Sequence, residues 1–294
     1  MTGAPDMDMP LSRFADPTRR WVDAPTRTVS AAGNTFAYRQ LGPADGVPVL
    51  LLNHWGANLD NFDPRIVDGL AAGRPVVALD YRGVGASGGK APLTVAEMAT
   101  DTVATLQALG LDRVDIVGFS LGGFVAQEVA LRAPALVRRL ILAGTGPAGG
   151  TGIERVGAVS WPLILKGLLT IKDPKTYLFF TASETSRRAA EAFLGRLKER
   201  TSDRDTAVGM GTFLRQLKAI KDWGRQAPQD LARIACPVLV ANGDRDLMVP
   251  SPNSTDMARR LPDAELILYE DAGHGGIFQY HEVFTRKAVA FLNA

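Results

Sequence analysis

The segment Gly118-Phe119-Ser120-Leu121-Gly122 fits the pattern G-x-S-x-G, and its surroundings indicate how it folds. Residues 114–117 are rich in β-branched side chains, which predicts a buried strand. Residues 123–131 predict a helix that ends before Ala133-Pro134. A strand, a sharp turn and a helix with serine at the apex form a nucleophile elbow. The alternative is a glycine-rich strand–helix turn in which the serine is incidental.

Ser120 at such an apex must adopt a strained backbone conformation so that its hydroxyl projects from the turn. Small neighbours on both sides let the strand and the helix pass closely. The helix that follows directs its free N–H groups and the positive end of its dipole to the same point. The segment therefore predicts a site that exposes a serine hydroxyl beside hydrogen-bond donors.

The composition is that of a globular protein, with 294 residues of which 46% are hydrophobic and 22% charged. The formal charge is only +2, so we expect neither nucleic acid nor a membrane as partner. Cys236 is the single cysteine, which excludes an internal disulfide, and the first 20 residues show no signal peptide. We therefore expect a cytoplasmic protein, and the sequence indicates no oligomeric state.

Strand and helix patterns alternate along most of the chain. Eight runs predict strands, at residues 26–30, 36–41, 47–52, 75–79, 114–117, 140–143, 237–241 and 265–268. Helices are predicted between them at residues 64–72, 94–109, 123–131 and 253–260, with a last one at 280–292. The first two strands flank a turn and predict a hairpin. The alternation predicts an α/β fold with a mostly parallel sheet and helices on both faces.

The region 147–227 breaks this alternation, because only helical periodicities occur there. We expect a helical cap inserted into a core of residues 26–146 and 228–294, preceded by a loosely packed arm, residues 1–25. Ligands of parallel sheets bind beyond the carboxyl ends of the strands, which the cap would roof. Three aromatic residues of the cap are candidates for substrate contact: Trp161, Phe179 and Phe213. These side chains could instead only hold the cap together.

A serine nucleophile needs a base, and the chain has three histidines, His54, His274 and His281. His274 lies in a glycine-rich loop after the last predicted strand, at the same sheet edge as Ser120, and is the candidate base. The alternative is a loop histidine kept for turn geometry. His281 falls at the start of the last helix, where we expect a surface role. His54 either borders its loop or contacts the substrate.

A carboxylate must orient the imidazole, and Asp244 and Asp246 both qualify by position. A tight turn at Gly243 would bring one of them inward and leave the other at the rim, where Arg245 could pair with it. The oxyanion needs two backbone N–H donors. We expect these to come from Leu121, which follows the nucleophile, and from the loop after residues 47–52, where we choose Trp55.

These motifs resemble those of the α/β-hydrolase superfamily, over nearly all of the chain after the arm. The matching segments are Gly118 to Gly123, Asp80 to Ser87, Gly243 to Asp246 with Val249-Pro250 after it, and Gly273-His274. The resemblance implies an eight-stranded sheet and selects Asp246 as the acid, since relatives use the Asp of G-x-x-D. It also implies a structural role for Asp80. Relatives usually have His-Gly after the third strand, where this chain has Asn53-His54; Trp55 keeps the oxyanion position.

The Ser-His-Asp set implies a serine hydrolase of the carboxylesterase or lactonase kind, acting on a small ester-like substrate through an acyl-enzyme. We expect no cofactor and no metal, because one cysteine and scattered histidines lack ligand spacing. Alternatives with similar chemistry are a cofactor-free perhydrolase of the haloperoxidase kind and a C–C hydrolase. A ligand receptor or signalling module on the same fold is an alternative of another class.

Overall fold

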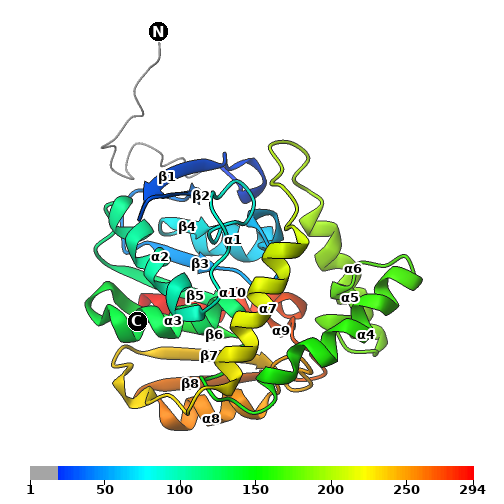
Figure 1. Cartoon of the computed structure of the whole chain (residues 1–294). Helices are drawn as coiled ribbons and strands as arrows, with labels where there is room; N and C mark the ends of the chain where they lie inside the picture. Colours follow the sequence, from blue (N-terminus) through cyan, green and yellow to red (C-terminus); the bar gives the residue numbers. More distant parts are fainter. Residues whose placement is uncertain (1–18) are drawn as a thin grey trace.

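The computed structural model describes residues 19–294 and builds them around one eight-stranded sheet (Figure 1). The order across the sheet is β1-β2-β4-β3-β5-β6-β7-β8, and β2 runs antiparallel to both of its neighbours while the other pairs are parallel. The strands are β1 (Arg27–Ala31), β2 (Asn34–Leu41), β3 (Val49–Leu52), β4 (Val76–Leu79), β5 (Val114–Phe119), β6 (Val137–Ala143), β7 (Val238–Gly243) and β8 (Ala264–Tyr269). The predicted α/β fold with a mostly parallel sheet is confirmed.

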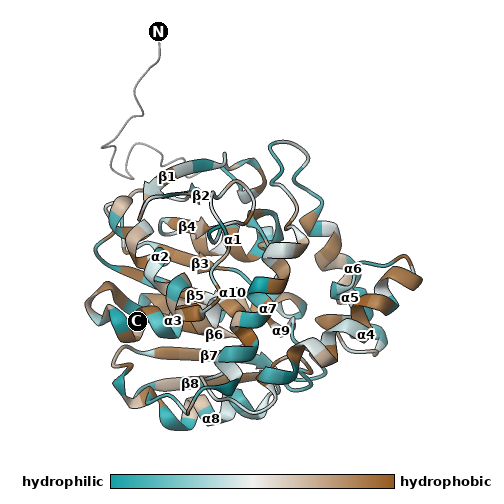
Figure 2. Cartoon of the chain, viewed as in Figure 1, coloured by the Kyte–Doolittle hydropathy of each residue, from teal (hydrophilic) through white to brown (hydrophobic). Residues whose placement is uncertain are grey.

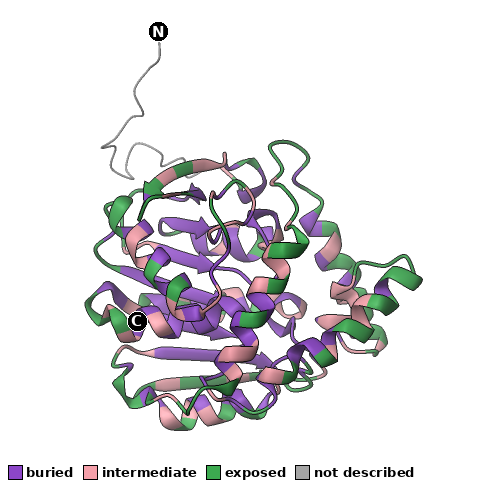
Figure 3. Cartoon of the chain, viewed as in Figure 1, coloured by how far each residue is buried: buried purple, intermediate pink, exposed green. Residues whose placement is uncertain are grey.

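Helices cover both faces of this sheet. On one face α1 packs against α10, and on the other α2 packs against α3 (Figure 1). These helices and the one beside β7 and β8 are α1 (Pro64–Ala71), α2 (Val95–Ala108), α3 (Leu121–Arg132), α8 (Pro252–Arg260) and α10 (His281–Asn293). Every residue of β3, β4 and β5 is buried, as Figure 3 shows, because both faces are covered. These strands are accordingly apolar along most of their length (Figure 2).

Local capping fixes where two of the helices begin. The hydroxyl of Thr94 accepts a hydrogen bond from the Glu97 N–H at 3.1 Å, and Asp63 accepts one from the Arg65 N–H at 3.0 Å. Each bond satisfies a donor that the first turn of a helix leaves without an intrahelical acceptor. Both helices therefore begin within one residue of the starts predicted at residues 64 and 94.

Between β6 and β7 the chain is fully described and forms only helical elements. The α-helices among them are α4 (Val156–Leu169), α5 (Lys175–Leu178), α6 (Glu184–Leu197) and α7 (Met210–Arg225). In Figure 1, α4, α5 and α6 lie to the right of the sheet, and α7 crosses in front of it. Buried polar contacts attach them to the core. Arg196 of α6 pairs with Asp63 at 2.6 Å, and the Gly275 N–H donates to the Phe179 carbonyl at 2.8 Å. The helical segment is thus fastened at the edge of the sheet where the site was predicted.

The predicted N-terminal arm is described only from residue 19 onwards, and residues 1–18 lie outside the described part. Trp21 is only 2% exposed, and its ring meets that of Phe62 edge-on at 5.9 Å. The backbone N–H of Trp21 donates to the Asp68 carboxylate in α1 at 2.6 Å. Arg200 from the helical segment donates to the carbonyl of Val22 at 2.8 Å. This part of the arm is therefore not loosely packed, because Trp21 supplies apolar area to the core. No helix in residues 19–294 has both the length and the apolar character to cross a membrane.

The pair between Arg196 and Asp63 yields a stability prediction. Their side chains are 10% and 0% exposed, so Arg196→Ala leaves the buried carboxylate of Asp63 without the cation of its ion pair. We expect the free energy of unfolding to fall by about 3–5 kcal/mol, measured by urea unfolding. The control is Arg188→Ala on the same helix, which breaks an exposed pair with Glu184 and should cost below about 1 kcal/mol. Equal losses in the two variants would contradict this account.

Candidate active site

The turn between β5 and α3 holds Ser120 in a rare backbone conformation. Its φ is +56° and its ψ is −117°, a region that residues other than glycine seldom adopt. Ser120 donates its N–H to the Ala143 carbonyl at 2.8 Å, which ties the turn to β6. A Cβ at position 118 would lie 2.4 Å from the Gly122 carbonyl oxygen, and one at position 122 would lie 2.1 Å from the Leu52 carbonyl oxygen. The flanking glycines are therefore required by the close passage of strand and helix.

His274 and Asp246 meet at the same edge of the sheet. The distance from His274 Nδ1 to Asp246 Oδ2 is 2.7 Å, and neither side chain has exposed area. The other carboxylate oxygen accepts N–H groups from Met248 at 2.8 Å and Val249 at 3.0 Å. A carboxylate accepts, so Nδ1 of His274 carries the proton, and Nε2 is left as a hydrogen-bond acceptor.

Asp244, the other candidate acid, lies at the exposed rim of the sheet. Its carboxylate accepts the Ala272 N–H at 3.2 Å and makes no contact with His274. The pair that Arg245 could have made with this acid is not formed, because Arg245 pairs with Asp271 at 3.3 Å. The turn therefore separates the two aspartates as expected, but its arginine reaches across to the neighbouring loop.

The two predicted oxyanion donors flank the elbow. Leu121 begins α3, so its N–H has no intrahelical acceptor. In the loop after β3, the N–H groups on both sides of Trp55 are occupied: His54 donates to the Asn53 side chain at 2.8 Å and Gly56 to the Gln216 side chain at 2.9 Å. That leaves the Trp55 N–H as the donor of this tripeptide that is available to a ligand. The role of both donors stays a prediction.

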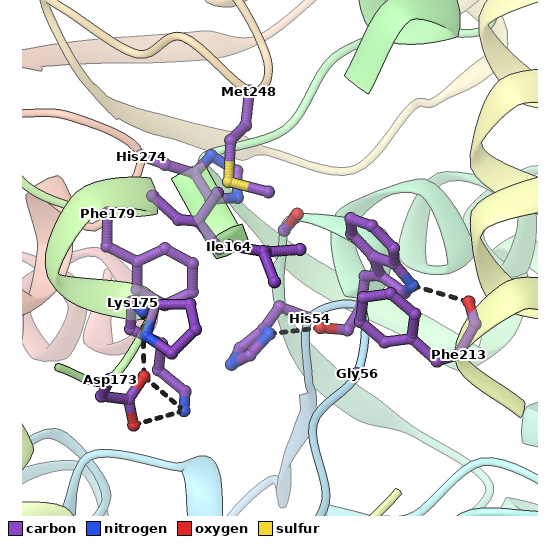
Figure 4. A pocket seen from close by; sticks show the side chains of 13 residues that line it. His54, Gly56, Ile164, Asp173, Lys175, Phe179, Phe213, Met248 and His274 are labelled. Carbon is purple, nitrogen blue, oxygen red and sulfur yellow. Dashed lines mark hydrogen bonds and ion pairs between the residues drawn. The ribbon is translucent and has the colours of Figure 1, made fainter. Parts of the chain in front are cut away.

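A cavity of about 180 Å³ is shared by Ser120, His274 and the loop that carries Trp55 (Figure 4). It is lined by His54, Trp55, Gly56, Ser120, Ile164, Asp173, Pro174, Lys175, Leu178, Phe179, Phe213, Met248 and His274. Of the residues predicted to contact substrate, His54, Phe179 and Phe213 lie in this wall. Among residues 19–294, no group of three or more His, Cys, Asp or Glu side chains is arranged to hold a metal ion.

Trp161 corrects the prediction for the helical segment, because it does not line the cavity. Its side chain is 41% exposed, and its ring packs on that of Phe213 at 5.9 Å. Phe213 in turn stacks on Trp55 with ring centroids 4.1 Å apart. Trp161 therefore supports a wall residue instead of touching the cavity itself, and Ile164, one turn further along α4, takes the lining position.

Several wall residues were not predicted from the sequence. Met248 lies two residues after Asp246, to which its N–H donates, so the acid loop itself brings this side chain to the cavity. The spacing from the acid was the signal that could have identified it. Lys175 and Leu178 lie on α5, which has four residues. A helix this short leaves no periodicity in the sequence, so nothing marked these residues as part of the site.

His54 lies in the cavity wall close to His274 and is 5% exposed. Its Nδ1 donates to the Trp55 carbonyl at 2.8 Å, and the rings of Phe119 and Phe179 meet it edge-on at 5.6 Å and 5.1 Å. Burial, and after it the charge of Lys175, lower the pKa of His54 to about 3. His54 is therefore neutral near pH 7. The third histidine, His281, begins α10 and is not part of this wall.

The low pKa of His54 predicts a pH dependence of stability. The unfolded imidazole titrates near its usual 6.5 and the folded one near 3, so the unfolded chain binds more protons between these values. The contribution of neutral His54 to the free energy of unfolding is therefore complete above pH 6.5. It is lost as the pH falls, by at most about 1.4 kcal/mol per pH unit. We expect His54→Phe to lose less unfolding free energy than the parent between about pH 7 and pH 5, measured by urea unfolding. Parallel pH curves would contradict it.

Three known proteins are similar to this chain over most of its length. The alpha/beta hydrolase fold protein from Chitinophaga pinensis has 37% sequence identity and a TM-score of 0.89, covering 94% of this chain and 100% of that chain. The putative carbamate hydrolase of Agrobacterium fabrum is 28% identical over 259 residues, 85% of this chain and 94% of that protein. The 2-hydroxy-6-oxononadienedioate/2-hydroxy-6-oxononatrienedioate hydrolase 1 of Dechloromonas aromatica is 29% identical over 245 residues, 79% of this chain and 81% of its own.

The relatives from Agrobacterium fabrum and Dechloromonas aromatica are both named as hydrolases, so the comparisons support a hydrolase role in general. The model of the alpha/beta hydrolase fold matches residues 47–279, from the approach to β3 to the end of α9 (Gly276–Gln279). This span includes the elbow, the acid loop and the histidine loop. The chain belongs to the alpha/beta hydrolase family.

Proposed function

We propose that this protein is a serine hydrolase that cleaves a carboxylic ester or lactone through an acyl-enzyme on Ser120. The observation that carries the proposal is the buried hydrogen bond of 2.7 Å between His274 and Asp246. His274 also lines the cavity that Ser120 lines. A serine at an elbow, an imidazole of fixed tautomer and a buried carboxylate are the parts that acyl transfer requires.

In the first half of the reaction, Ser120 Oγ attacks the carbonyl carbon while His274 Nε2 takes the hydroxyl proton. The negative charge that develops on the carbonyl oxygen is stabilised by the N–H groups of Leu121 and Trp55. The tetrahedral intermediate then expels the alcohol, which receives the proton from His274. An ester bond to Ser120 has formed and the substrate ester bond has broken.

In the second half, a water molecule attacks the acyl carbon as His274 again accepts a proton. The proton returns to Ser120 Oγ when the acid product leaves, so the enzyme is restored. Asp246 stabilises the imidazolium that exists between the two transfers and keeps the ring oriented. Its second oxygen is held by two backbone N–H groups, so the carboxylate cannot swing away from the ring.

The cavity wall favours small apolar acyl or alcohol groups. Most of the side chains that line the cavity beside Ser120 are apolar: Trp55, Ile164, Pro174, Leu178, Phe179, Phe213 and Met248. Each substrate CH₂ buried against them contributes about 0.8 kcal/mol to binding. A volume of about 180 Å³ leaves room for a short chain only, which supports short-chain esters and small lactones as the substrate class.

A second candidate is the hydrolysis of a C–C bond, because the Dechloromonas aromatica relative is named for such a substrate. Against it, relatives of that kind often carry Trp soon after the catalytic histidine, where this chain has Gly275-Gly276. A panel of esters, lactones, thioesters and a vinylogous 1,5-diketone acid separates the two candidates. Preferred turnover of the diketone acid would replace the ester proposal.

We predict that Ser120→Ala lowers kcat on short-chain esters by about 10⁴-fold or more, since it removes the nucleophile. Activity is measured as initial rates with a chromogenic ester under multiple-turnover conditions. A melting curve of the variant controls for folding. Activity within a few-fold of the parent, with contaminating hydrolases excluded, contradicts the assignment. A single slow turnover by the parent protein would favour a ligand receptor over an enzyme.

We predict that Asp246→Asn reduces kcat/KM by about 10³-fold or more, because the amide no longer fixes the tautomer of His274. Asp244→Asn is the matched control, since it changes the same atoms on the same loop at the exposed rim. We expect that control to stay within a few-fold of the parent. The reverse ranking in the same assay would move the acid to Asp244.

A further inference from the structure

The cavity contains a second buried imidazole that the acyl-transfer steps do not use. We propose that His54 binds substrate, with Nε2 accepting a hydrogen bond from a neutral hydroxyl or N–H group near the scissile bond. This inference rests on the proposed function, and it narrows the substrate class to esters or lactones that carry such a donor. Four observations support it: the tautomer of the ring, its fixed position, the unpartnered nitrogen and the charges around it.

The tautomer follows from the partner of Nδ1. That nitrogen lies 2.8 Å from the Trp55 carbonyl, and a carbonyl can only accept. Nδ1 therefore carries the proton, and Nε2 presents a lone pair. The neutral form is favoured by burial, which lowers the pKa of His54 to about 3. A ring that resists protonation in this way accepts a hydrogen bond but is a poor proton-transfer base.

The position of the ring is fixed by its own loop. The backbone N–H of His54 donates to the Asn53 side chain at 2.8 Å, and the amide of Asn53 donates to the Asn58 carbonyl at 3.0 Å. The rings of Phe119 and Phe179 pack against the imidazole of His54 in T-shaped contacts. A binding group held in this way loses little conformational freedom when a ligand arrives.

The Nε2 atom of His54 is buried and receives no hydrogen bond from the described residues. His274 Nε2 is in the same state and lines the same cavity. In the proposed mechanism, Nε2 of His274 accepts the proton of the nucleophile, whereas no step of that mechanism supplies a donor for Nε2 of His54. A buried acceptor without a donor is unfavourable, so a ligand that brings a donor gains affinity by occupying it.

The charges near His54 restrict which donor fits. Figure 4 shows its free nitrogen on the side of the ring turned toward Lys175 and Asp173, which pair at 3.2 Å. The nearby ammonium of Lys175 disfavours a cationic donor, and an ionised carboxylate has no proton to donate. A hydroxyl or an amide N–H remains. A hydroxyl suits the place best, since it can donate to Nε2 while it accepts from Lys175.

The test uses matched substrates that differ in one donor. One pair is the p-nitrophenyl ester of 3-hydroxybutanoate and of 3-methoxybutanoate, and a second is 2-hydroxyethyl and 2-methoxyethyl butanoate. A third replaces the hydroxyl by an N–H, with p-nitrophenyl N-acetylglycinate and its N-methyl analogue. We expect the parent protein to favour the donor-bearing member of at least one pair by about tenfold or more in kcat/KM, because its methylated analogue leaves the buried acceptor unpaired.

His54→Phe keeps an aromatic ring in the wall but removes the acceptor. We expect the ratio within the preferred pair to fall toward one, while effects on the shared machinery cancel in the ratio. His54→Gln, which carries an amide oxygen, should restore part of the preference. The control is His281→Phe, the same substitution outside the cavity, which should leave the ratio at the parent value.

The inference is overturned if the parent shows a ratio near one in all three pairs, or if His54→Phe leaves a high ratio intact. A parent that turns over no ester refutes the proposed function separately. In that case calorimetry with Ser120→Ala decides the inference without turnover. Tighter binding of the hydroxylated than of the methoxy ligand, lost in Ser120→Ala with His54→Phe, supports it, and equal affinities overturn it.

Discussion

The site depends on the close approach of two backbones, where Gly122 at the start of α3 lies against the Leu52 carbonyl at the end of β3. A Cβ at this glycine would lie 2.1 Å from that oxygen, so no other residue allows the contact. The approach brings the N–H of Leu121 beside the loop that carries Trp55. It also holds Ser120 at the apex, where the backbone has a φ of +56°. One packing contact thereby positions the serine and both predicted oxyanion donors together.

The helical segment from α4 to α7 completes the cavity because it is joined to the core by bonds that water does not reach. Phe179 is the central link: its carbonyl accepts from Gly275, beside His274, and its ring contacts His54. The pair between Arg196 and Asp63 attaches α6, which follows Phe179 in the segment. Walls held in this way keep one shape, so the size and chemistry of the cavity select the substrate, in agreement with pre-organised sites in general.

The parts predicted correctly from the sequence are those that local rules determine. The starts of α1 and α2 and the elbow follow from short patterns whose physics is contained in a few residues. The partners of Trp161 and Arg245 could not be identified from the sequence because they are distant along the chain. Periodicity shows that a helix has an apolar face but not which surface covers it. A turn shows that a side chain is exposed but not which neighbouring loop it reaches.

The two histidines of the cavity differ in the group that bonds to Nδ1. Each ring bonds through Nδ1 and has a buried Nε2 without a hydrogen bond from the described residues, yet His274 bonds to the carboxylate of Asp246 and His54 to the neutral carbonyl of Trp55. A carboxylate stabilises the imidazolium that proton transfer creates. A carbonyl does so weakly, and the charge of Lys175 opposes it. In the mechanism that we propose, the same side chain is therefore a base at one position and a hydrogen-bond acceptor at the other, because the group bonded to Nδ1 determines what each imidazole can do.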